Sequence, residues 1–245
     1  MRRSERPWAS VPPGLWALLG IILAAQVLLR AGAPPPTALA SELPPPPATP
    51  YLRVAALDDP PTLAYAMALR LQTFDNQPGV SLPFASLDYA RVEAWLDAML
   101  ALDPAGQYPM LMAAHLYAQV LGHPDKQREM AEFVYRKFLE SPRRRWPWLA
   151  HVAIMAKHRL KDPRLAIRYA DAIRDHANAP EVPSWARQMH IFLREDVGEV
   201  ESARALLGGL LDSGTVTDPQ EFRFLMERLK AMDAETPTSL PKTRR

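Results

Sequence analysis

Cysteine is absent from this 245-residue chain, and glycine is scarce at 10 residues. Without thiols the chain can form no disulfides, and thiolate nucleophiles and zinc or iron–sulfur sites built on cysteine are excluded. An excess of one charge is also lacking, because 29 basic and 27 acidic residues leave a formal net charge of +2. The total charge therefore does not indicate nucleic acid as a ligand.

Long apolar runs are confined to the N-terminus, where one run extends from Val11 to Leu29. Nineteen helical residues of about 1.5 Å each span roughly 28 Å, which matches the hydrocarbon core of a bilayer. Three arginines precede the run: Arg2, Arg3 and Arg6. This bias predicts a cytoplasmic segment over 1–10, a transmembrane signal-anchor helix over 11–33 and an exported remainder.

A cleaved signal peptide is the alternative interpretation of this segment. The small residues AGA at 31–33 suit a cleavage site, but Pro34 follows them directly. The sequence ALA at 38–40 precedes Ser41 but lies far from the apolar run. We therefore favour an uncleaved anchor.

Proline is abundant, with 26 residues in the chain. Eight of them lie in residues 34–50, PPPTALASELPPPPATP. Such a segment favours extended polyproline II, with about 3.1 Å of rise per residue. The pattern predicts a linker that could hold a domain up to about 50 Å from a membrane. The polar sequence DAETPTSLPKTRR at 233–245 predicts a disordered tail.

Residues 51–232 show almost no strand signal and predict an all-α domain. Apolar residues recur at i, i+4, i+7 and i+8, the stripe of an amphipathic helix. Breakers joined to helix-start signals, such as LDP at 102–104 and KDP at 161–163, divide the segment. The expected helices span 60–75, 87–102, 107–121, 124–140, 144–160, 163–177, 183–197, 200–213 and 218–232. The short turns between them predict antiparallel neighbours.

The longest irregular stretch of this domain is TFDNQPGVSLPFASLD, residues 73–88. Pro78 and Gly79 are turn formers, and Val80, Leu82 and Phe84 alternate as in an extended segment. A long connection and a binding loop are both compatible with this pattern.

A repeat becomes visible when every second helix is aligned. The apolar stripes are Val92, Leu96, Met99 and Leu100; Ala131, Tyr135, Phe138 and Leu139; Leu165, Tyr169, Ala172 and Ile173; and Ala203, Leu207, Leu210 and Leu211. Their first members are 39, 34 and 38 residues apart. A helix pair that recurs at this period buries its apolar face against the next pair.

These repeats resemble the tetratricopeptide repeat family. GEVESARALLGGLL at 198–211 is similar to the turn and second helix of that family, with Ala203 at its small position. RLAIRYADAI at 164–173 is similar, with Tyr169 at a bulky position, and AMLALDP at 98–104 resembles a repeat ending. The first helices depart from the family, because SWARQMHIFLRED lacks the Leu-Gly pair. The resemblance covers about 60–213 and implies an α-solenoid that binds a partner protein and has no enzymatic activity.

Local signatures of catalysis are missing from the sequence. The six histidines form no HExxH motif and no pair four residues apart, and no phosphate loop or GxSxG motif occurs. His151 and His158 share a helical face, but no third metal ligand is evident. We therefore expect no catalytic residue, metal site or cofactor, and no small-molecule substrate. An enzyme with a noncanonical site remains the alternative.

The stretch SPRRRWPWLAH, residues 141–151, suggests an interaction surface. The window 136–168 contains ten basic and two acidic residues. The candidate partner-binding residues are Arg143, Arg144, Arg145, Lys157 and Arg159. A solvated turn whose tryptophans anchor a helical hairpin is the competing interpretation. An acidic protein or an anionic membrane would suit the patch, whereas the expected topology argues against nucleic acid.

The favoured hypothesis is a membrane-anchored helical-repeat scaffold that mediates protein–protein interaction in a bacterial cell envelope. The Ala-, Arg- and Pro-rich composition suggests a bacterial source, an inner-membrane anchor and a periplasmic domain. An enzyme subunit and a purely structural subunit of a membrane complex are the alternatives.

The anchor hypothesis predicts the topology. A phosphatase fused after residue 232 should be active, because the arginines before the apolar run hold the N-terminus in the cytoplasm. The mature protein should also retain Trp8, as N-terminal sequencing would show. An inactive phosphatase would contradict the orientation, and a mature N-terminus at Ser41 would contradict the anchor.

Overall fold

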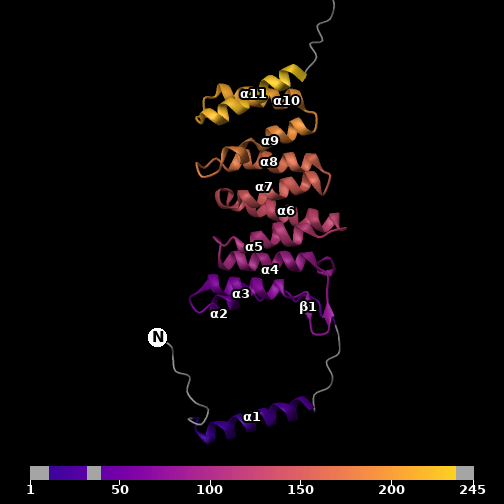
Figure 1. The fold of residues 1–245 in the computed structure, drawn as a ribbon, viewed down its shortest axis with the longest axis vertical. Helices are drawn as coiled ribbons and strands as arrows, with labels where there is room; N and C mark the ends of the chain where they lie inside the picture. Colours follow the sequence, from indigo (N-terminus) through magenta and orange to yellow (C-terminus); the bar gives the residue numbers. More distant parts are fainter. Residues whose placement is uncertain (1–10, 32–39, 236–245) are drawn as a thin grey trace, which may run out of the picture. The chain divides into compact units, whose positions relative to one another are not determined.

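The computed structural model describes residues 11–31 and 40–235, and within them the chain is essentially all-α, with eleven α-helices of which α2 to α11 pack in sequence order (Figure 1). The helix α1 and the segment 77–81 are described apart from the larger unit. In that larger unit the helices from α2 to α11 follow one another as a stack (Figure 1). This confirms the predicted fold class of sequentially packed helices.

The helix α1 spans Pro13–Ala31, and none of its side chains is buried. An 18-residue window within its 19 residues has a mean hydropathy of 1.9. Length and composition are those of a membrane anchor or a signal sequence. Arg30 lies in its last turn, whereas the predicted orientation signals at residues 2, 3, 6 and 8 lie outside the described residues.

The predicted linker becomes part of the folded domain well before residue 51. The Leu43 side chain is 3% exposed and belongs to the main core. Trp95 Nε1 donates to the Pro44 carbonyl at 2.8 Å, and Arg91 donates to the Leu43 carbonyl at 2.7 Å. The prediction of a free spacer over 34–50 is therefore wrong from Leu43 onward. The extended proline-rich backbone offers carbonyls to which side chains of the helix α4, Tyr89–Leu102, donate hydrogen bonds.

An additional helix, α2, spans Thr49–Ala55 and was not predicted. The other long helices lie within a few residues of their predicted positions: α3 Pro60–Gln72, α4 Tyr89–Leu102, α6 Pro124–Glu140, α7 Pro142–His158, α8 Pro163–His176, α9 Ser184–Asp196, α10 Val200–Asp212 and α11 Pro219–Glu235. The start signals act as expected. Asp162 accepts from the Leu165 amide at 3.0 Å, and Asp218 accepts from the Gln220 amide at 2.7 Å.

The predicted helix at 107–121 is irregular. A short α5, Tyr108–Leu111, continues into a π-helical turn, η3, over Met112–Leu116, and then into a 3₁₀ turn, η4, over Tyr117–Gln119. Each change of helical pitch rotates the side chains that follow it. The faces of this segment therefore differ from those of a regular helix.

Residues 73–88 contain a short hairpin and a 3₁₀ turn. Strands β1, Asn76–Gln77, and β2, Val80–Ser81, pair as a small hairpin whose Gly79 adopts a φ of 77°. A 3₁₀ turn, η2, follows at Phe84–Ser86. Lys126 donates to the carbonyls of Ala85 and Leu87 at 2.6 and 2.7 Å. These bonds tie the end of the connection to α6.

The buried side chains form two apolar clusters, one from Leu43 to Leu193 and the other from Ile191 to Met232. The predicted stripes lie in these clusters with few exceptions. The prediction that Leu139 belongs to a buried stripe is wrong, because its side chain is 43% exposed at the end of α6. Leu207 is fully buried in the second cluster, where α9, α10 and α11 meet.

A matched pair of leucines tests the stacking. Leu207→Ala should lower the free energy of unfolding by about 2–5 kcal/mol, because it leaves a cavity between helices. Leu121→Ala removes the same atoms from a side chain that is 79% exposed, so it should have little effect. Chemical denaturation followed by circular dichroism measures both. Equal stabilities of the two variants would contradict the packing of α10.

Candidate functional site

The predicted arginine cluster does not form one surface, because Arg145 is buried with 4% of its area exposed. Arg145 Nη1 donates to the Lys137 carbonyl at 2.7 Å and to Glu140 at 3.0 Å. Its place in the first turn of α7 turns the side chain back onto the end of α6. Arg145 therefore joins two helices and is not a partner-binding residue.

The other four predicted residues are exposed or half-buried and lie at opposite ends of α7. Arg143 pairs with Glu181 at 2.7 Å, whereas Arg144 has no side-chain partner in the described part of the chain. Lys157 pairs with Asp196, and Arg159 donates to the Gln119 carbonyl at 3.3 Å. About fourteen residues of helix place the two groups roughly 21 Å apart.

Acidic residues from neighbouring helices compensate much of the local positive charge. The pairs are Arg136 with Glu93, Lys137 with Asp97 and Arg168 with Glu132, all at 2.7–2.8 Å. A sequence window counts charges along one segment, but the stack places other segments against it. The excess of basic residues over 136–168 is consequently much smaller on the folded surface.

A different set of partly exposed side chains lies on helices that contact one another, and we call it the aromatic–histidine surface. It is contributed by α3, α5, η3 and α7 and consists of Tyr65, Tyr108, His115, Trp148 and His151. The rings of Tyr65 and Tyr108 lie 5.5 Å apart, and His115 contacts both Trp148, at 5.9 Å, and His151, at 3.7 Å. Tyr65 is 54% exposed, and the other members are exposed or half-buried.

Hydrogen bonds hold this surface in place. Trp148 Nε1 donates to Gln107 Oε1 at 2.7 Å, and the Tyr108 hydroxyl donates to Gln72 at 2.7 Å. Gln119 lies 2.7 Å from His151 Nε2. These bonds restrict the side-chain rotamers of Trp148, Tyr108 and His151.

Burial lowers the pKa of His151, and the neighbouring His115 and Arg159 lower it further. The imidazole is therefore neutral near pH 7, and its Nε2 accepts from the Gln119 amide. The ring that packs on His151 is that of His115 from another helical segment, not that of His158, which was predicted to share its helical face. No group of three potential metal ligands occurs within residues 11–31 and 40–235.

The pairing of His115 with His151 could not be predicted from the sequence. His115 lies in the π-helical turn, where 3.6-residue periodicity no longer predicts its direction. The two histidines are 36 residues apart and meet only because η3 packs on α7. No local pattern carries that information.

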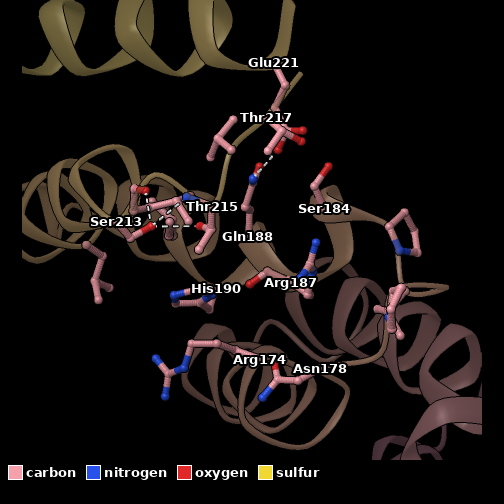
Figure 2. Close-up of a pocket in the computed structure, with 17 residues that line it drawn as sticks. Arg174, Asn178, Ser184, Arg187, Gln188, His190, Ser213, Thr215, Thr217 and Glu221 are labelled. Atoms are coloured by element: carbon pink, nitrogen blue, oxygen red, sulfur yellow. Dashed lines mark hydrogen bonds between the residues drawn. The ribbon is translucent and has the colours of Figure 1, made fainter. Parts of the chain in front are cut away.

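A cavity of about 530 Å³ lies near the far end of the stack, between the α8–α9 connection, α9 and the α10–α11 connection (Figure 2). Its floor includes the buried side chains of Val182, Gln188, His190 and Ile191. Exposed residues, including Arg187, form its rim. The cavity lies where the two apolar clusters meet, and none of its residues was predicted as a site.

The chain matches no model of a protein family, no curated protein and no solved structure. What the fold establishes is a helical protein with sequential packing and one N-terminal apolar helix.

The position of Arg145 generates a prediction that separates it from its neighbour. Arg145→Gln should lower the free energy of unfolding by about 1–3 kcal/mol, because the part-buried Lys137 carbonyl loses its side-chain donor. Arg144→Gln should change it by less than about 0.5 kcal/mol, since that side chain is exposed. Urea denaturation compares the two. An unaltered stability of the Arg145 variant would show that these hydrogen bonds contribute nothing net.

Proposed function

We propose that this protein is a membrane-anchored, tetratricopeptide-like scaffold that binds a partner protein on its aromatic–histidine surface. The observation that carries the proposal is a line of partly exposed rings on α3, α5 and α7, every second helix of the stack, with Tyr65 against Tyr108 and His115 against Trp148 and His151. Aromatic side chains are enriched in the residues that dominate binding energy at protein interfaces. The line supports an extended peptide segment as the bound element.

The stacked architecture also supports this function. Each helix pair contributes one or two rings, so successive residues of an extended partner would meet successive repeats. The resemblance to tetratricopeptide repeats implies a solenoid that binds a partner protein. The scaffold supplies rigidity, because the packed helices position rings that a single helix could not hold.

The cellular setting is part of the proposal. The apolar helix α1 has the length of a membrane span. The arginines that precede it favour a cytoplasmic N-terminus, with the helical domain on the other side of the membrane. A bacterial inner membrane and the periplasm are the setting that we favour from the composition.

Two other functions remain as alternatives. An enzyme subunit with a noncanonical site would use the cavity beside α9, which is lined by polar and apolar groups. A structural subunit of a membrane complex would act through α1 instead. Neither alternative assigns a role to the aromatic–histidine surface.

Crosslinking tests the proposal. A photoreactive amino acid at Tyr65 or His115 should crosslink the partner in intact membranes, because both side chains are exposed on the surface. The same probe at Trp185, which is 52% exposed on α9 and outside the surface, is the control. The double variant Tyr65→Ala, His115→Ala should reduce co-purification of the crosslinked partner at least tenfold, about 1.4 kcal/mol of binding free energy.

The folded state of the double variant must be checked by thermal unfolding, which should be nearly unchanged because the truncated side chains are exposed. Crosslinks from Trp185 alone, or full co-purification with the folded double variant, would contradict this binding surface.

A further inference from the structure

The cavity beside α9 combines an unpaired cation, an uncapped helix terminus, a buried imidazole and an apolar wall. Its volume of about 530 Å³ lies within the range of about 300–1,000 Å³ usual for pockets that hold small ligands. Figure 2 shows Ser184, Arg187 and His190 of α9 lining it opposite Thr215 and Thr217 of the α10–α11 connection.

Positive charge is concentrated at the rim of the cavity. Arg187 has no side-chain partner in the described part of the chain, whereas Arg174, also in the lining, pairs with Asp171 and Asp175. The helix α9 starts at Ser184 without a side-chain cap, because Pro183 precedes it. Unpaired amides and the helix dipole favour an anion at such a terminus. Arg187 and the start of α9 therefore suit a carboxylate.

The floor of the cavity presents a hydrogen-bond acceptor. His190 is 5% exposed, and its Nδ1 donates to the Arg187 carbonyl at 2.8 Å. Burial lowers the pKa of His190, and the nearby Arg174 lowers it further, so the ring is neutral near pH 7. Its Nε2 then carries a lone pair and has no partner in the described part of the chain. A ligand with an N–H group would satisfy it.

The remaining lining is largely apolar. Leu206, Leu210 and Val216 form one wall, and Val182 and Ile191 make part of the floor apolar. Glu221 is the single carboxylate in the lining, and it is occupied by a hydrogen bond from Gln188. The wall accordingly suits an aliphatic side chain, and the occupied Glu221 leaves Arg187 available to an anionic ligand.

We propose that this cavity binds the free C-terminal carboxylate of a peptide whose last residue has an aliphatic side chain. The carboxylate accepts from Arg187 and from the first amides of α9. The amide N–H of the last residue donates to His190 Nε2, and the aliphatic side chain lies against Leu206 and Leu210. The site is separate from the aromatic–histidine surface, and the inference does not depend on the function proposed for that surface.

The test uses the full-length protein in detergent and a peptide with a fluorophore at its N-terminus, Ala-Ala-Ala-Leu. Fluorescence anisotropy should show saturable binding that weakens as salt rises, because the interaction includes an ion pair. The same peptide with a C-terminal amide should bind at least tenfold more weakly. Equal binding of the acid and the amide, or no saturable binding of either, would overturn the proposal.

A double-mutant cycle assigns the effect to Arg187. In Arg187→Gln the difference between acid and amide peptides should shrink at least threefold, because the ion pair is gone and only the first amides of α9 still distinguish them. Arg144→Gln, which removes an exposed arginine from the first turn of another helix, should keep the full difference. A full difference in Arg187→Gln would also overturn the proposal. Circular dichroism confirms that both variants are folded.

Two further probes identify the source of the carboxylate. Unlabelled 4-methylpentanoate has the carboxylate and the branched chain but no N–H group, and N-acetyl-leucine restores the N–H group. In competition, both should bind more weakly than the unlabelled tetrapeptide, with N-acetyl-leucine the tighter of the two. Equal affinity of 4-methylpentanoate and the tetrapeptide would show that the cavity takes a small fatty acid instead. The double variant Tyr65→Ala, His115→Ala should leave the peptide affinity unchanged.

Discussion

The structure depends on one constraint: no helix pair in this chain can bury its apolar face alone. Each pair presents a stripe of leucine, alanine and aromatic residues that must pack against the next pair. Fully buried residues such as Val92, Phe133 and Leu207 lie at these junctions. Because the stripes recur along the chain, the helices pack in sequence order, and distant parts of the domain meet only through the helices between them.

Polar groups at the junctions add specificity to this packing. Arg145 joins the end of α6 to the start of α7, and Gln127 donates to the Val120 carbonyl beside η4. Trp95 and Arg91 capture the backbone before α2, which extends the folded unit toward the N-terminus. Buried polar groups of this kind tolerate few alternative arrangements, because each lost partner costs free energy.

The same stacking creates both candidate binding regions. Between α3 and α7 the first helices bring rings from separate repeats into one line, and the π-helical turn places His115 against His151. Near α9 the two apolar clusters meet without filling the space between them, which leaves a cavity with a polar rim. One region is an exposed surface and the other is a cavity open at its rim, so they suit ligands of different size.

The sequence by itself determined the helices, because their signals are local. Apolar periodicity placed the long helices, and the Asp-Pro pairs at 162–163 and 218–219 marked the starts of α8 and α11. The length and composition of α1 were equally evident. Only the tertiary structure decided which charged and aromatic groups are free. The packing of the helices buries Arg145 and pairs Arg143 with Glu181. It also places His115 against His151, which lies 36 residues away in the sequence. These contacts depend on the side chains of neighbouring helices, which no pattern within a single helix contains.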